Sequence, residues 1–197
     1  MPPSSDSNYR IWGVDPGAHY CYLDFIEGFD DDFRLTRGDP LADEWPDGVA
    51  YRMDPAFKKH VALSDNLNAV GGVVVVSERL KAFVEAQGVR NVQFLGVDIL
   101  NHKGRKVEPA YFILHPIHPQ PCIDVAKSAV EWNDLNADYI LSMERLVLDE
   151  ARIDPSVALF RAKHLRDCVF VHQDLAAEIE AGGFSGVEFW ALSDYEG

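Results

Sequence analysis

The chain has 197 residues, of which 47% are hydrophobic and 25% are charged, and its 32 Asp and Glu against 18 Lys and Arg give a net charge of −14. This length and composition support one hydrophobic core, or at most two small ones, and exclude a disordered chain. The negative charge disfavours nucleic acid and anionic membranes as partners, because binding to either needs Lys and Arg. The same charge attracts a basic protein.

The three cysteines, Cys21, Cys122 and Cys168, are widely separated and form no CxxC pair. An odd number at such spacing argues against a disulfide framework and a zinc ribbon, and it fits a reducing compartment. The N-terminal residues lack the basic and apolar regions of an export signal. The longest apolar run, residues 70–76, is far shorter than the ~20 residues of a membrane span. We therefore expect a cytoplasmic protein.

Residues 1–51 are expected to form an irregular, acidic N-terminal subregion that packs on a second region, residues 52–197, within one compact unit. Turn-forming residues cluster at 15–17, 38–40 and 46–48. The subregion also contains aromatic side chains that need burial, which predicts contact with the rest of the chain. These residues are Trp12, Tyr20, Tyr22, Phe25 and Phe29.

Residues 73–94 align without a gap onto residues 168–189, and nine of these 22 positions are identical. Average residue usage would give roughly one or two matches by chance. In each segment a short apolar strand precedes an amphipathic helix pattern, which ends at Gly88 or Gly183 and is followed by a second strand. The pattern predicts two duplicated strand-helix-strand units.

The remaining elements are mostly strands. Residues 92–100 and 107–115 flank a turn-rich tetrapeptide and predict a hairpin. Residues 139–148 and 157–163 predict further strands, and the three prolines of residues 116–121 predict a loop. The fold class expected from the whole sequence is α+β and strand-rich.

The most metal-like cluster is His115, His118 and Cys122, since imidazole and thiolate bind zinc and copper. The intervening prolines stiffen this loop, and no further ligand pair lies nearby in the sequence. We therefore expect no metal. In this interpretation His115 ends a strand, His118 lies in a solvated loop and Cys122 fills an apolar gap.

Ser77 and His172 stand at equivalent places in the two units, between strand and helix. A serine there can act as a nucleophile, but the G-x-S-x-G elbow is absent, so a helix N-cap is the simpler role. The pair Gly71-Gly72 precedes a strand, whereas phosphate-binding glycines follow one. The sequence thus predicts no catalytic residue and no cofactor.

The stretch from Asp24 to Asp54 contains ten acids and three Arg, and Asp30, Asp31 and Asp32 stand between Phe29 and Phe33. One interpretation is an acidic surface with aromatic anchors that binds basic groups of a protein partner. The other is a solvated acidic loop beside ordinary core aromatics. The candidate partner-binding residues are Asp30, Asp31, Asp32, Asp43, Glu44 and Asp47.

Four phrases occur in order between Arg52 and Trp190: VSERLKAFVEA, YFILHPIHPQPCIDVAKS, ERLVLDEARIDPSVALFRAK and VFVHQDLAAEIEAGGFSGVEF. In this order they resemble family eleven of the polymorphic-toxin immunity proteins, formerly a bacterial domain of unknown function. The first 51 residues lie outside the resemblance. None of the phrases is a catalytic signature.

The resemblance implies a cytosolic bacterial antidote that binds and blocks a cognate toxin, often one delivered by a contact-dependent or type VI secretion system. It supplies no catalytic residues and leaves the toxin's activity open. Two alternatives stand beside it. One is an enzyme with a site in a cleft between the two units, and the other is a self-associating structural or adaptor module.

Overall fold

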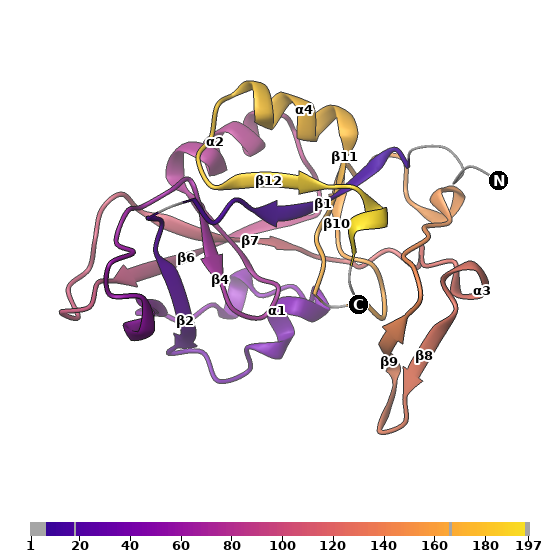
Figure 1. Cartoon of the computed structure of the whole chain (residues 1–197), viewed down its shortest axis with the longest axis horizontal. Coiled ribbons are helices and arrows are strands. Elements are labelled where there is room, and N and C mark those ends of the chain that lie inside the picture. The colour runs from indigo at the N-terminus through magenta and orange to yellow at the C-terminus, as the bar shows by residue number, and fades with distance from the viewer. Residues whose placement is uncertain (1–6, 18, 166, 196–197) are drawn as a thin grey trace.

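The computed structural model describes residues 7–17, 19–165 and 167–195, and it contains a barrel, an open sheet and a hairpin (Figure 1). The closed barrel has the strand order β2 (Tyr22–Glu27), β3 (Ala50–Met53), β6 (Val92–Leu100), β7 (Tyr111–Pro116), β5 (Val74–Ser77) and β4 (Asn66–Ala69). The open sheet has the order β10 (Leu159–Phe160), β11 (Phe170–His172), β1 (Tyr9–Val14) and β12 (Val187–Trp190). The hairpin consists of β8 (Val130–Asn133) and β9 (Asn136–Met143).

Helices are few and short. The α-helices are α1 (Phe33–Arg37), α2 (Glu78–Ala86), α3 (Val125–Ser128) and α4 (Gln173–Ala181), and single 3-10 turns occur at Ala42–Glu44, Pro55–Phe57, Glu150–Arg152 and Leu192–Asp194. The predicted strand-rich α+β class is confirmed.

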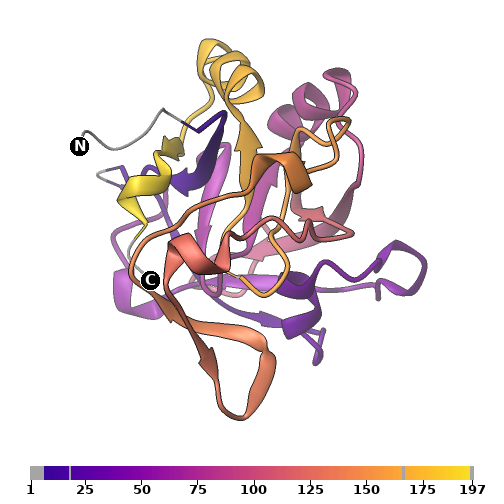
Figure 2. The ribbon, with the colours of Figure 1, turned by 90° about the vertical axis from the view of Figure 1, so that its right-hand side faces the viewer.

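The barrel strands β5 and β7 are buried on both faces, which explains their nearly continuous apolar sequences. Val75 and Ile113 point into the barrel core, whereas Val76 and Leu114 point outward into a second core. That second core is covered by α2 and α4, which lie side by side in both views (Figures 1 and 2).

Each of the two predicted units forms a strand, a helix and a strand at matching positions. Strands β5 and β6 lie on either side of β7, and β11 and β12 lie on either side of β1, with antiparallel pairing throughout. Both helices begin directly after the first strand and are followed by a glycine with positive φ, Gly88 (+68°) and Gly183 (+62°). A duplication as the origin of this likeness stays a prediction.

The space between the two units is a packed core. Leu80 and Val84 of α2 and Ile179 of α4 are fully buried in the same cluster. At its edge the rings of Phe83 and Phe184 are in contact, with centroids 5.0 Å apart. The alternative of an enzyme places a cleft between the two units, but packed side chains fill this place in the structure.

The N-terminal residues are part of both sheets. β1 is an inner strand of the open sheet, paired with β11 on one side and β12 on the other. β2 and β3 are neighbours in the barrel, and the expected boundary at residues 51/52 falls inside β3. Strands β1, β2 and β3 therefore fold together with the two strand-helix-strand units.

The expected burial of Phe25 is wrong, because β2 contains a bulge. Leu23 pairs with Met53 but Ile26 pairs with Tyr51, so β2 has one extra residue between these two pairs. Leu23 and Ile26 consequently both pack on the barrel core, and Phe25 turns outward with 68% of its surface exposed. Trp12, by contrast, is buried as predicted.

Two of the remaining predictions were close and one was too long. The hairpin predicted over residues 92–115 is formed by β6 and β7, and the strand predicted at 139–148 overlaps β9. The strand predicted at 157–163 pairs with β11 over two residues only, in β10. Beyond Phe160 the backbone pairs instead with the loop at Gln120, to which Lys163 N–H donates at 2.8 Å.

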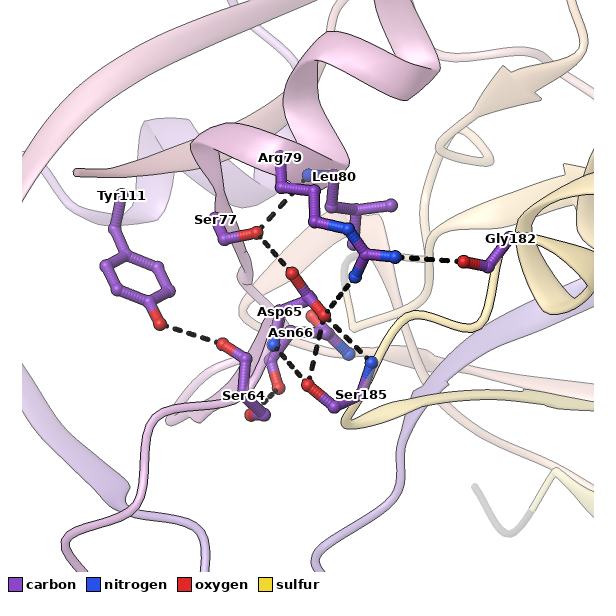
Figure 3. Close-up of polar contacts among 9 residues, drawn as sticks. All are labelled: Ser64, Asp65, Asn66, Ser77, Arg79, Leu80, Tyr111, Gly182 and Ser185. Atoms are coloured by element: carbon purple, nitrogen blue, oxygen red, sulfur yellow. Dashed lines mark hydrogen bonds and ion pairs between the residues drawn. The ribbon is translucent and has the colours of Figure 1, made fainter. Parts of the chain in front are cut away.

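A polar seam joins the barrel to the open sheet (Figure 3). The Asp65 carboxylate accepts hydrogen bonds from Ser77 Oγ at 2.8 Å and from the N–H and Oγ of Ser185 at 3.0 Å each, and it pairs with Arg79 at 2.9 Å. Arg79 also donates to Gly182 O at 3.0 Å. One carboxylate thus connects the start of α2 with the loop that follows α4.

Asn66 completes this seam from the first position of β4. Its side chain is fully buried, and Nδ2 donates to Gly13 O in β1 and to Gly186 O before β12, both at 3.0 Å. Gly186 has φ +75°, and a Cβ there would lie 2.4 Å from Asn66 O. The backbones at Asn66 and Gly186 therefore lie too close together for a side chain at position 186, which needs glycine.

We predict that Asn66→Ala lowers the free energy of unfolding by roughly 1–3 kcal/mol, because it removes two buried hydrogen bonds, to Gly13 O and to Gly186 O, and leaves Gly186 O with the bond from Asp15 N–H. Urea denaturation would show a lower midpoint at an unchanged m-value. The control is Asn68→Ala on the same strand, where the side chain is only partly buried. Equal losses in the two variants would contradict a special role for Asn66.

Acid unfolding tests Asp65. Burial acts to raise the pKa of Asp65, but hydrogen bonds from Ser185 and Ser77 and the charge of Arg79 outweigh it and hold the pKa below its usual value. As the pH falls, Asp65 takes up its proton at a higher pH in the unfolded chain than in the folded one. The stabilisation from Asp65 is therefore present above about pH 4 and is lost as the pH falls through the lowered pKa. We expect Asp65→Asn to be less stable at pH 7 and to lose less stability on acidification. An unchanged pH slope in urea melts from pH 7 to pH 2.5 would contradict this.

Candidate functional site: an acidic surface beside an apolar hollow

The first acidic segment follows the bulged strand β2. Gly28, with φ +81°, turns the chain after β2, and the exposed residues Asp30, Asp31 and Asp32 lead into α1. This short helix is held by Leu35, which is 1% exposed and packs in the barrel core. With Leu35 inside, the preceding Phe33 lies 47% exposed on the surface.

The second acidic segment, residues 41–48, is tied to β6. The N–H groups of Leu41 and Ala42 both donate to Gln93 Oε1, at 2.8 and 3.1 Å. Trp45 Nε1 donates to Gly96 O at 2.8 Å. These contacts hold the exposed residues of the loop in place, and the acids among them are Asp43, Glu44 and Asp47.

Two contacts bring the acidic segments together. The rings of Phe29 and Trp45 meet with centroids 4.8 Å apart, and Arg34 of α1 forms an ion pair with Glu44. Phe29 directly precedes Asp30, and Trp45 directly follows Glu44. The structure thus gathers the sequence-predicted acids into one region, which we call the acidic surface: Asp30, Asp31, Asp32, Asp43, Glu44 and Asp47.

Charge on the acidic surface is only partly compensated. The hydrogen bond and the charge of Arg34 lower the pKa of Glu44. Arg34 and Arg37 also lie 3.7 and 3.6 Å from the carboxylate of Asp39. Across the described ranges 7–17, 19–165 and 167–195, no Lys or Arg lies within ion-pair distance of the other five acids. The surface therefore keeps a negative potential.

An apolar hollow of about 210 Å³ adjoins Asp32. Phe25, Phe33 and Val70 line it and are 68%, 47% and 50% exposed. We call it the Phe25 hollow. The sequence-based hypothesis includes Phe33 as an aromatic anchor beside the acids, but it does not include Phe25 or Val70. Phe25 is missed because the bulge that exposes it leaves no mark in the apolar pattern.

The metal candidates lie in different surroundings. His115 is fully buried, with Nε2 at 2.7 Å from Asp39 O, whereas His118 is exposed. Cys122 packs in an apolar cluster, and burial raises the pKa of its thiol to about 12. Within the part of the chain that the structure describes, no three His, Cys, Asp or Glu side chains are grouped so as to hold a metal ion.

Ser77 is a helix N-cap, as predicted. Its hydroxyl oxygen accepts a hydrogen bond from Leu80 N–H at 3.2 Å, and the same hydroxyl donates a hydrogen bond to the Asp65 carboxylate. The residue is 3% exposed, so its oxygen is engaged inside the seam. His172, at the equivalent place, accepts from Asp174 N–H at 3.3 Å and caps α4 in the same way.

Comparison with known protein families settles the class of the chain. Residues 14–194 match the immunity protein family Imm11. The chain belongs to the Imm11 immunity protein family. A comparison with curated proteins found no match. None of the helices among the described residues is long and apolar enough to cross a bilayer.

The Imm11 match begins well before Arg52, where the sequence resemblance had begun. It includes only the last residue of β1, Val14, and all of β2, α1 and β3. The acidic surface and the Phe25 hollow therefore lie inside the family region. This agrees with the structure, in which these N-terminal elements belong to the same two sheets as the later strands.

Proposed function

We propose that this Imm11 protein is a bacterial antidote that binds and neutralises a cognate toxin in the cytoplasm, with the toxin delivered by a contact-dependent or type VI secretion system. The observation that carries the proposal is the family match over residues 14–194. An inhibitor of this kind needs a stable scaffold and a complementary surface, and it needs no reacting groups.

The toxin binds, in this proposal, at the acidic surface and the Phe25 hollow. Exposed Phe25 and Phe33 offer apolar anchors beside Asp30, Asp31 and Asp32, and an interface with a desolvated aromatic centre and a charged rim has this composition. The toxin's complementary surface is basic. Charge at the rim accelerates encounter, while burial of the aromatic rings supplies affinity.

The test of the function is co-expression with the product of the adjacent gene, scored by growth and by co-purification. We expect that the adjacent protein is toxic alone and that the full chain restores growth and co-purifies with it. Absence of both rescue and a complex would contradict the proposed function.

Deletion of residues 1–50 is not a usable variant in this test. It removes β1, an inner strand of the open sheet, and β2, a barrel strand. Loss of rescue would then report unfolding. Substitution of exposed side chains separates binding from folding, because such changes affect stability by about 0.5 kcal/mol or less.

Charge reversal tests the acidic surface. We expect the triple variant Asp30→Lys, Asp31→Lys, Asp32→Lys to associate with the adjacent-gene product at least tenfold more slowly at low salt and with a weaker salt dependence. Surface plasmon resonance at several ionic strengths measures both quantities.

The matched control reverses three exposed acids on α4 and β12, Glu178, Glu180 and Glu188. It changes the net charge equally, so the difference between the two variants reports position. Equal association rates for the two triple variants would mean that the acidic surface is not the binding site.

A further inference from the structure

The β8–β9 hairpin projects from the body of the protein in both views (Figures 1 and 2). Its base is fixed, because Ile140 and Met143 are buried in the core beneath the open sheet and Ile140 N–H donates to His164 O at 3.0 Å. The ring of His164 also contacts that of Trp132, with centroids 5.3 Å apart. The hairpin is thus a projection on a rigid base.

The tip of the hairpin is braced by its own side chains. Asn133 Oδ1 accepts from the N–H groups of Leu135 and Asn136, at 2.9 and 3.1 Å, and Asn136 Oδ1 accepts from Asp138 N–H at 3.1 Å. Asn side chains that accept from the backbone two residues on stabilise tight turns. The turn therefore presents Leu135 in a defined position, with 98% of its surface exposed.

Apolar exposure on this hairpin exceeds what the fold requires. Leu135 stands at a turn position that Asn, Asp or Gly fills more readily. Leu141 and Trp132 are also exposed, at 53% and 36%. A single exposed leucine is ordinary, but Leu135 and Leu141 together on one projecting element indicate a contact surface, while Trp132 packs partly on His164.

The hairpin is also acidic throughout. Residues 130–143 contain three Asp and Glu and no Lys or Arg. The carboxylate of Asp138 lies 4.0 Å from His164, and Glu131 accepts a hydrogen bond from Ser142 at 3.0 Å. A leucine tip with Asp134 and Asp138 beside it matches a recess with an apolar floor and a basic rim.

We propose that the β8–β9 hairpin inserts Leu135 into a positively charged recess of the toxin, as a second contact in addition to the acidic surface. This inference rests on the proposed function. A second copy of this chain is a poor occupant, because it has a net charge of −14 and the same acidic hairpin. The hairpin and α1 both lie toward the lower side of the molecule (Figures 1 and 2).

The experiment measures binding of the full-length chain to the purified product of the adjacent gene. Leu135→Ala is expected to raise Kd at least tenfold, as truncation of an interface hot spot does, while Leu135→Met stays within about threefold of the unchanged chain. Because Leu135 is almost fully exposed, thermal melts of the variants should coincide. The control, Val61→Ala, changes another exposed aliphatic residue, outside the hairpin, and should leave Kd unchanged.

A photo-crosslinking residue at position 135 locates the recess. The expected product joins the hairpin to a toxin peptide that contains Lys or Arg. Unchanged Kd for Leu135→Ala, or a cross-link only to an acidic segment, would overturn the hairpin contact while the unchanged chain still binds and protects. Failure of the unchanged chain to bind would overturn the proposed function and this inference together.

Discussion

The arrangement of the whole molecule depends on the polar seam at Asp65 and Asn66. Two sheets with different strand orders meet there, and their backbones approach too closely for an apolar side chain to separate them. Buried backbone groups at such a junction need partners. Asn66 supplies donors to β1 and to the residue before β12, and Asp65 collects donors from the start of α2 and from the loop after α4. The hydrogen bonds at the seam set how the barrel and the open sheet are oriented relative to each other. The apolar cores on either side contribute the larger share of stability.

The seam also positions the proposed binding surface. Asn66 is the first residue of β4, and β4 pairs in parallel with β2, the strand that carries Phe25. Val70 follows β4 directly and lines the Phe25 hollow with Phe25 and Phe33. The orientation of the acidic surface relative to the open sheet is therefore set through β4 and β2. The β8–β9 hairpin is fixed separately, through Ile140 and Met143 in the core on the other side of that sheet.

Local patterns in the sequence predicted local structure well. The helix limits follow from Ser77 and His172 as N-caps and from the glycines after each helix, and the β6–β7 hairpin follows from its turn residues. Long-range pairing had no such signal: β1 enters the open sheet between strands more than 150 residues later in the chain, and the parallel pairs β2–β4 and β3–β6 close the barrel. The bulge in β2 reversed the predicted burial of Phe25, because an extra residue shifts the alternation without changing composition. The acids of the proposed site can be predicted from their clustering in the sequence. Val70 and Phe25 cannot, because only the pairing of β2 with β4 in the barrel brings them together.

The central claim is that this Imm11 protein acts by covering a toxin with one preformed, acidic face. Hydrogen–deuterium exchange of the full-length chain, alone and in complex with the product of the adjacent gene, measures this most directly. The account predicts slower exchange on binding in residues 25–47 and 130–141, with α2 and α4 unchanged. Protection confined to α2 and α4, with no change in those two segments, would contradict it.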